Sequence, residues 1–107
     1  DNHMNIKTLA SEAEVAYSGG SISITGDVCW DVDRQYLYQM DEDEMPNSLS
    51  VNLDYYGLVP GLDQTFIKDY SENEGVTDEL VKLGLVKKIG IATFGPFDTT
   101  AYLVEIL

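Results

Sequence analysis

Residues 86–106 read VKKIGIATFGPFDTTAYLVEI, and this stretch points to a sheet. Two runs rich in β-branched, aliphatic and aromatic residues, 86–94 and 100–106, flank a Gly-Pro-Phe-Asp sequence at 95–98 that is typical of a turn. This pattern predicts an antiparallel β-hairpin. Because neither run carries much charge, we expect the hairpin to lie at the centre of a sheet.

Shorter strand patterns lie upstream of this hairpin. In 48–54, SLSVNLD, apolar residues alternate with polar ones and share one face of a half-buried strand. The apolar residues of this run are Leu49, Val51 and Leu53. A Ser-Gly-Gly sequence at 18–20 precedes another alternating run at 21–25 and indicates a hairpin turn. The remaining predicted strands are 28–31, 35–40 and a short extended piece at 65–69.

The clearest helix pattern follows Gly75. Thr77 is expected to cap the helix by accepting from backbone N–H groups, the acids at 78–79 complement the helix dipole, and Gly84 ends the helix. The Ala and Glu residues of 5–13 favour a second short helix that continues into an extended segment. The sequence therefore predicts an α+β fold, a mostly antiparallel sheet of about five to six strands with one or two short helices.

The chain length fits a single domain. With 107 residues, 44% of them hydrophobic, the chain can build one core, and its aromatic and aliphatic residues argue against disorder. We expect one acidic α+β domain over residues 4–107, with residues 1–3 as a cloning remnant ahead of Met4. Within the core we expect Trp30 and Tyr102 to be buried.

Excess acid is the strongest feature of the composition. The chain has 19 Asp and Glu against 6 Lys and Arg, a formal net charge of -13. Residues 27–79 hold fourteen of these acids but only two bases, Arg34 and Lys68, a local net charge of −12. Such a field repels nucleic acid and anionic membranes and attracts basic surfaces or cations. We therefore expect neither direct nucleic-acid binding nor membrane binding.

Most enzyme classes lack their required residues in this sequence. The single histidine, His3, falls in the expected remnant, so no Ser/His or Cys/His pair is expected, and one cysteine cannot make the usual Cys/His zinc site. The Ser-Gly-Gly-Ser sequence at 18–21 lacks the lysine of a phosphate-binding loop. The sequence therefore predicts a protein without enzymatic activity, cofactor or metal.

Three features predict a cytoplasmic location. Cys29, the only cysteine, has no partner for an internal disulfide and is expected to be a buried apolar residue, which agrees with a reducing compartment. No apolar run approaches the roughly 20 residues of a membrane-spanning helix. No basic stretch followed by an apolar segment indicates a signal peptide.

Residues 31–42 match part of a calcium-binding loop. Asp31, Asp33 and Glu42 fall at positions one, three and twelve of an EF-hand, but position six, which needs Gly for a sharp turn, is Tyr36. We therefore do not expect an EF-hand. Two alternatives without nucleic-acid mimicry stay open. The chain could be an acidic accessory domain that binds a divalent cation or small ligand, or a structural component of a phage or plasmid system.

The acids also follow a pattern. Several lie at i, i+2 spacing, which on an extended chain places charges about 6.7 Å apart on one face. Duplex DNA carries one charge per about 1.7 Å of its axis, so the pattern imitates DNA at a lower charge density. We predict a surface that pairs with Lys and Arg, with Tyr55 and Tyr56, which cannot both face inward, as aromatic anchors. The predicted partner-binding residues are Asp31, Asp33, Asp41, Glu42, Asp43, Glu44, Asp54, Tyr55, Tyr56, Asp63, Asp69, Glu72 and Glu74.

Four short stretches carry a family resemblance. They are SLSVNL at 48–53, FIKD at 66–69, ELVKLGLV at 79–86 and the closing hairpin with Gly95 and Tyr102. These stretches resemble a group of small uncharacterised proteins carried by mobile elements and phages of Gram-positive bacteria. The chain departs from that group at Lys68 and Tyr70, where the group commonly has an FVDTN-like segment.

The resemblance implies a counter-defence role, because genes of this group look like neighbours of anti-restriction and anti-CRISPR genes, and small acidic proteins are frequent among Cas9 inhibitors. Together with the acid pattern, it predicts a monomeric or dimeric DNA mimic without enzymatic activity. Its expected partner is the basic nucleic-acid-binding surface of a bacterial defence nuclease, with type II Cas9 as the first candidate. Binding in the host cytoplasm would block access of DNA or guide RNA.

Overall fold

The computed structural model describes residues 5–107, and the remnant expected at 1–3 lies outside the described residues. The described chain forms eight strands, one α-helix and three 3-10 turns. The strands are β1 (Ile6–Tyr17), β2 (Ile22–Asp31), β3 (Tyr36–Met40), β4 (Pro46–Ser48), β5 (Ser50–Val51), β6 (Gln64–Ile67), β7 (Val86–Phe94) and β8 (Thr99–Ile106). The helix is α1 (Val76–Lys82), and the 3-10 turns are Ser18–Gly20, Asp54–Tyr56 and Ser71–Asn73.

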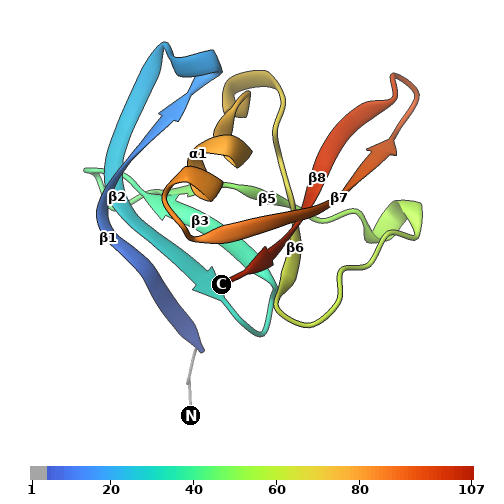
Figure 1. Cartoon of the computed structure of the whole chain (residues 1–107), viewed down its shortest axis with the longest axis horizontal. Coiled ribbons are helices and arrows are strands. Elements are labelled where there is room, and N and C mark those ends of the chain that lie inside the picture. The colour runs from blue at the N-terminus through green and yellow to red at the C-terminus, as the bar shows by residue number, and fades with distance from the viewer. Residues whose placement is uncertain (1–4) are drawn as a thin grey trace.

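The strands form two four-stranded sheets with antiparallel pairing throughout. The first sheet has the order β1-β2-β3-β4 and the second the order β5-β6-β8-β7. Figure 1 shows the first sheet on the left, the second on the right and α1 between them. The predicted α+β fold with mostly antiparallel strands is confirmed, but the predicted count of five to six strands in a single sheet is wrong.

The predicted strand 48–54 is divided between the two sheets. Leu49 separates β4 from β5, and its backbone serves both sheets: its N–H donates to the Leu37 carbonyl over 2.9 Å, and its carbonyl accepts from the Lys68 N–H over 2.8 Å. The side chain of Leu49 packs in the main core, whereas Leu53 packs in a second, smaller cluster. The alternation correctly marks Leu49, Val51 and Leu53 as residues with apolar surroundings. It could not show that the chain changes sheets between them.

The first segment is a strand, so the short helix expected at 5–13 is wrong. β1 pairs with β2 from Ile6 opposite Asp31 to Tyr17 opposite Ile22. It also buries Ala13 and Val15 in the main core. Helix propensities differ by less than about 1 kcal/mol per residue, which long-range pairing and burial easily outweigh.

The main core lies between the two sheets and under α1. Strands of both sheets contribute to it, and Trp30, Leu37 and Leu80 are fully buried there. The predicted burial of Trp30 and Cys29 is confirmed, whereas Tyr102 is only half-buried. In the described part of the chain, no helix has both the length and the apolar composition needed to cross a membrane.

The helix predicted after Gly75 is present, but its cap differs from the prediction. Gly75 occupies the N-cap position with φ 88, and Thr77 lies inside the helix with its side chain buried. The carboxylate of Asp69 takes over the capping function. It accepts from the Gly75 N–H over 2.8 Å and from the Thr77 N–H over 2.9 Å, so a residue six to eight positions upstream satisfies the first turn.

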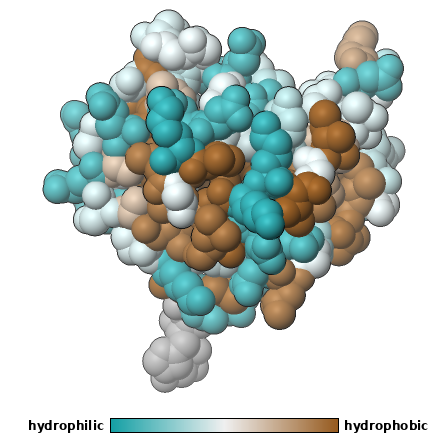
Figure 2. Space-filling model, in the orientation of Figure 1, coloured by the Kyte–Doolittle hydropathy of each residue, from teal (hydrophilic) through white to brown (hydrophobic). Residues whose placement is uncertain are grey.

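The C-terminal hairpin forms as predicted, but only one of its strands is central. β8 lies between β6 and β7, while β7 is an edge strand. Ile91 of β7 is 65% exposed. Figure 2 shows apolar side chains gathered over the middle of the face where α1 and β7 lie.

Candidate binding surface

The predicted partner-binding residues do not form one cluster. Figure 1 shows the turn that follows β3, which carries residues 41–44, at the left edge of the molecule. The 3-10 turn Asp54–Tyr56 lies at the right edge. The acidic turn and the two tyrosines therefore lie at opposite edges of the molecule in this view.

Carboxylates converge around one groove at the left end of the first sheet. This acidic groove is about 600 Å³ in volume, within the range of ligand pockets. Its lining includes five acids and neither lysine nor arginine. The acids are Glu12, Asp27, Asp41, Glu42 and Glu44, and the other lining residues are Thr25, Gly26 and Met40.

Two of the five acids build the groove by accepting backbone hydrogen bonds. Asp27 Oδ1 accepts from the Glu12 N–H over 2.9 Å, at the point where β1 bulges and Glu12 has φ 51. Asp41 Oδ1 accepts from the N–H groups of Asp43 and Met45, each over 2.9 Å, and so holds the acidic turn in shape. Both walls of the groove are therefore fixed by carboxylates.

The floor of the groove depends on close approach of β2 to β3. A Cβ atom added to Gly26 would lie 1.7 Å from the Met40 carbonyl oxygen, so glycine is required there. On the core side, the fully buried Gln39 braces the same region. Its Nε2 donates to the carbonyls of Ala13 and Ile24 over 3.0 Å each, and its Oε1 accepts from the Tyr17 hydroxyl over 2.6 Å.

The sequence did not predict two members of this groove. Glu12 lies outside the acidic region 27–79, and Asp27 lies in that region but was not among the expected binding residues. The bulge in β1 turns Glu12 toward the acidic turn. A bulge in a segment that favours a helix by composition leaves no recognisable sequence signal.

Three predicted binding acids are engaged within the molecule. Asp31 is only 5% exposed, and its Oδ1 accepts from the Arg34 N–H over 3.1 Å. Asp69 caps α1. Glu72 is exposed, and a hydrogen bond from the Lys68 ammonium lowers the pKa of its carboxyl to about 2. These interactions leave Asp31 and Asp69 with structural roles.

The acids outside these groups are exposed but dispersed. Asp33 lies in the turn between β2 and β3, Asp63 in the turn before β6, and Glu74 just before α1.

Among residues 5–107, no group of three or more His, Cys, Asp or Glu is placed to hold a metal ion.

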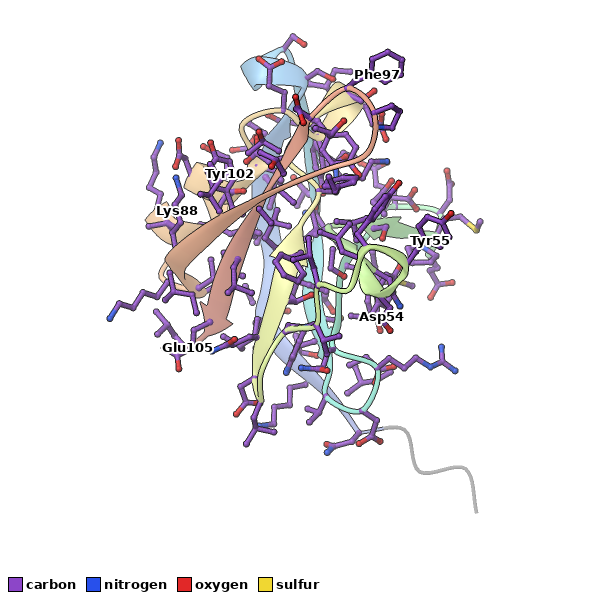
Figure 3. The ribbon with its side chains drawn as sticks, turned by 90° about the vertical axis from the view of Figure 1, so that its right-hand side faces the viewer. Asp54, Tyr55, Lys88, Phe97, Tyr102 and Glu105 are labelled. Atoms are coloured by element: carbon purple, nitrogen blue, oxygen red, sulfur yellow. The ribbon has the colours of Figure 1, made fainter. Side chains whose placement is uncertain are left out.

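The two predicted tyrosine anchors lie away from the acidic groove. Tyr55 is 92% exposed, whereas Tyr56 packs against Phe94 of β7 with ring centroids 5.4 Å apart. Figure 3 shows Asp54 and Tyr55 on one side of the molecule, with Lys88 and Glu105 on the other. Tyr55 is therefore exposed for contact, at the edge of the molecule opposite the acidic turn (Figure 1).

Comparison of the chain with protein-family models, with curated proteins and with solved structures found no match.

Proposed function

We propose that this chain is a binding protein without catalytic activity that uses the acidic groove to occupy a basic, nucleic-acid-binding surface of another protein. The observation that carries the proposal is the convergence of five carboxylates from three separate segments around one groove whose lining holds no base. Lysine and arginine side chains of a partner would pair with the carboxylates of this groove in the same way that they pair with phosphates on DNA.

The overall charge supports the same partner chemistry. A net charge of -13 on 107 residues produces a field that accelerates association with basic proteins and opposes association with nucleic acid. The exposed glutamates Glu12, Glu42 and Glu44 have no ion-pair partner among the described residues, so their charge is available to a partner.

The proposed target is a bacterial defence nuclease, with type II Cas9 as the first to test. This choice rests on the short sequence motifs that resemble proteins of mobile elements and phages, and on the match between an acidic groove and a channel built to hold nucleic acid. The inhibitor would act in the cytoplasm of the host cell.

A pull-down with purified Cas9, with and without guide RNA, tests this function. If the acidic groove occupies a nucleic-acid channel, the chain binds one loading state of Cas9 in preference to the other, and raising the salt to about 0.5 M weakens the complex strongly. Failure to bind either state would reject Cas9 as the target. Binding that does not change with salt would reject charge pairing as the mechanism.

A further inference from the structure

The outer face of β3 carries a line of half-buried side chains. Tyr36, Tyr38 and Met40 alternate with Leu37 and Gln39, which are fully buried on the other face. The rings of Tyr36 and Tyr38 stack with centroids 5.2 Å apart. Such a pair offers flat aromatic surface on which a guanidinium group can lie.

This line of side chains joins two cavities. Met40 lines the acidic groove, and Tyr36 lines a second cavity of about 850 Å³ at the other end of β3. The two residues are four positions apart, which corresponds to ~13 Å along a strand. We call the two cavities with Tyr36, Tyr38 and Met40 the β3 track.

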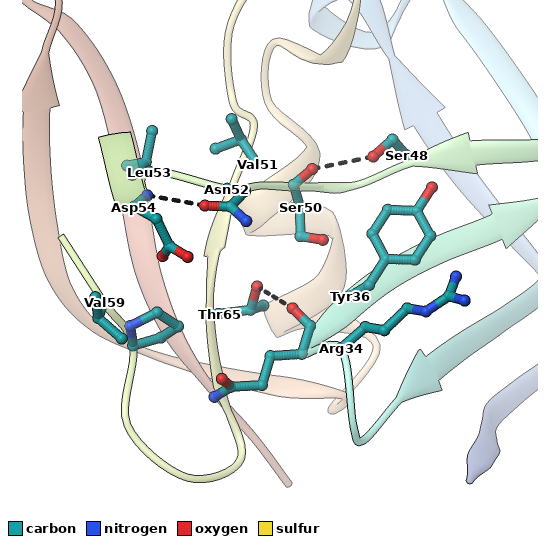
Figure 4. A pocket seen from close by; sticks show the side chains of 12 residues that line it. Arg34, Tyr36, Ser48, Ser50, Val51, Asn52, Leu53, Asp54, Val59 and Thr65 are labelled. Atoms are coloured by element: carbon teal, nitrogen blue, oxygen red, sulfur yellow. Dashed lines mark hydrogen bonds between the residues drawn. The ribbon is translucent and has the colours of Figure 1, made fainter. Parts of the chain in front are cut away.

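The walls of the second cavity mix polar residues with the apolar Val51, Leu53, Val59 and Pro60, and Asp54 is the single acid among them. Figure 4 shows the carboxylate of Asp54 directed into it, between Val59 and Thr65. The backbone N–H of Asp54 donates to Asn52 Oδ1 over 2.8 Å, but the carboxylate itself has no hydrogen-bond or ion-pair partner among the described residues. Its charge is therefore available to a cation that enters the cavity.

Two other polar side chains on the walls are already hydrogen-bonded within the protein. Ser50 Oγ accepts from the Leu37 N–H over 2.9 Å, and Thr65 Oγ1 donates to the Gln35 carbonyl over 2.9 Å. Arg34, the one base of the lining, lies at the end of the cavity opposite Asp54 in Figure 4. Its Nε is 3.8 Å from Asp31 Oδ2, so its charge is partly balanced within the protein.

We propose that the β3 track binds an extended, arginine-containing segment of the partner. One arginine enters the second cavity, with its aliphatic stem against Val51 and Val59 and its guanidinium beside Asp54. The chain then runs over Tyr36 and Tyr38, and a second basic residue about four positions away enters the acidic groove. This inference rests on the proposed function, because it specifies which feature of a basic partner the chain recognises.

Two short peptides of equal charge test the β3 track. One carries two arginines four positions apart, separated by Gly and Ser, and the other carries the same two arginines side by side. Titrated against the 15N-labelled protein, the spaced peptide should shift the amide signals of Tyr36, Tyr38, Asp54 and 41–44 together. It should also bind at least about tenfold more tightly, because its second contact forms intramolecularly.

Asp54→Asn is the diagnostic variant, with Asp98→Asn, in the exposed turn between β7 and β8, as its charge-matched control. Asp54→Asn should reduce the affinity of the spaced peptide to that of the adjacent one, and Asp98→Asn should leave the difference intact. Equal effects of the two variants would overturn the β3 track. Shifts confined to 41–44 with both peptides would overturn it while leaving the proposed function in place, and absence of any shift would count against both.

Discussion

At the level of single residues, several acids of this chain stabilise the fold instead of serving a partner. Asp69 accepts from two backbone N–H groups of the first turn of α1. The amide of Asn can accept from only one of these two N–H groups, so we predict that Asp69→Asn lowers the free energy of unfolding by about 0.5–1.5 kcal/mol, the usual net contribution of one hydrogen bond. Asp63→Asn removes the same charge from an exposed turn and should leave stability unchanged. Equal urea-unfolding midpoints for the two variants would contradict the capping role.

The hydroxyl of Tyr17 also stabilises the fold. It donates to the buried Gln39 Oε1, so Tyr17→Phe leaves a buried acceptor unpaired and should cost about 1–3 kcal/mol of unfolding free energy. The exposed Tyr55→Phe is the control and should have no effect. Chemical denaturation of both variants at neutral pH measures the difference.

The same hydroxyl makes stability depend on alkaline pH. Burial raises the pKa of Tyr17 well above its usual value. A raised pKa in the folded state means that its contribution is fully present below the unfolded-state pKa of about 10 and is lost as pH rises above it. The wild-type protein should therefore lose more stability than Tyr17→Phe between about pH 9 and pH 11. Parallel losses in the two proteins would contradict this assignment.

Only some residues of the candidate site could be predicted from the sequence. The run Asp41–Glu44 is recognisable as an exposed acidic turn, and three of its four acids, all but Asp43, line the groove. Glu12 could not be predicted, because its position depends on a bulge and on pairing with a strand fifteen residues away. Asp31 and Asp69 look like surface acids in the sequence, since only the folded backbone reveals the N–H groups they bind.

At the level of elements, the contact between β2 and β3 places the acidic turn beside the β1 bulge. Gly26 permits this contact, because any Cβ there would collide with the Met40 carbonyl. We predict that Gly26→Ala destabilises the protein by about 1–3 kcal/mol, as overpacking does, and weakens binding of basic partners. Gly90→Ala is the matched control, since its Cβ would meet Leu103 at an ordinary 3.6 Å.

Thermal unfolding and peptide binding of the two glycine variants check this prediction. Gly90→Ala should unfold near the wild-type temperature and keep wild-type affinity. A Gly26→Ala protein with unchanged stability and affinity would contradict the structural role given to this contact.

Local periodicity identified most of the strands but not how they are distributed between sheets. β8 and the turn before it follow directly from the pattern at 86–106. The division at Leu49 does not, because a residue that hydrogen-bonds to both sheets has the same alternation as one within a single strand. β1 was missed because its composition favours a helix and only its pairing with β2 makes it a strand.

At the level of the whole molecule, the excess of acid opposes folding and favours association with basic partners. The net charge of -13 implies self-repulsion in the folded state. Raising the ionic strength from about 20 mM to about 300 mM shortens the Debye length from about 20 Å to about 6 Å. The unfolding temperature should therefore rise with salt while affinity for a basic peptide falls. An unfolding temperature that falls over this range would contradict a dominant role for self-repulsion.

The association rate with Cas9 at low salt shows whether the acidic groove is the binding surface. The comparison uses two triple variants of equal charge: Glu12→Gln, Glu42→Gln and Glu44→Gln in the groove, and Glu74→Gln, Asp78→Asn and Asp98→Asn outside it. We predict that the groove variant associates at least about tenfold more slowly than wild type, and that the rate of the control variant stays within about twofold of wild type. Equal rates for the two variants would contradict it.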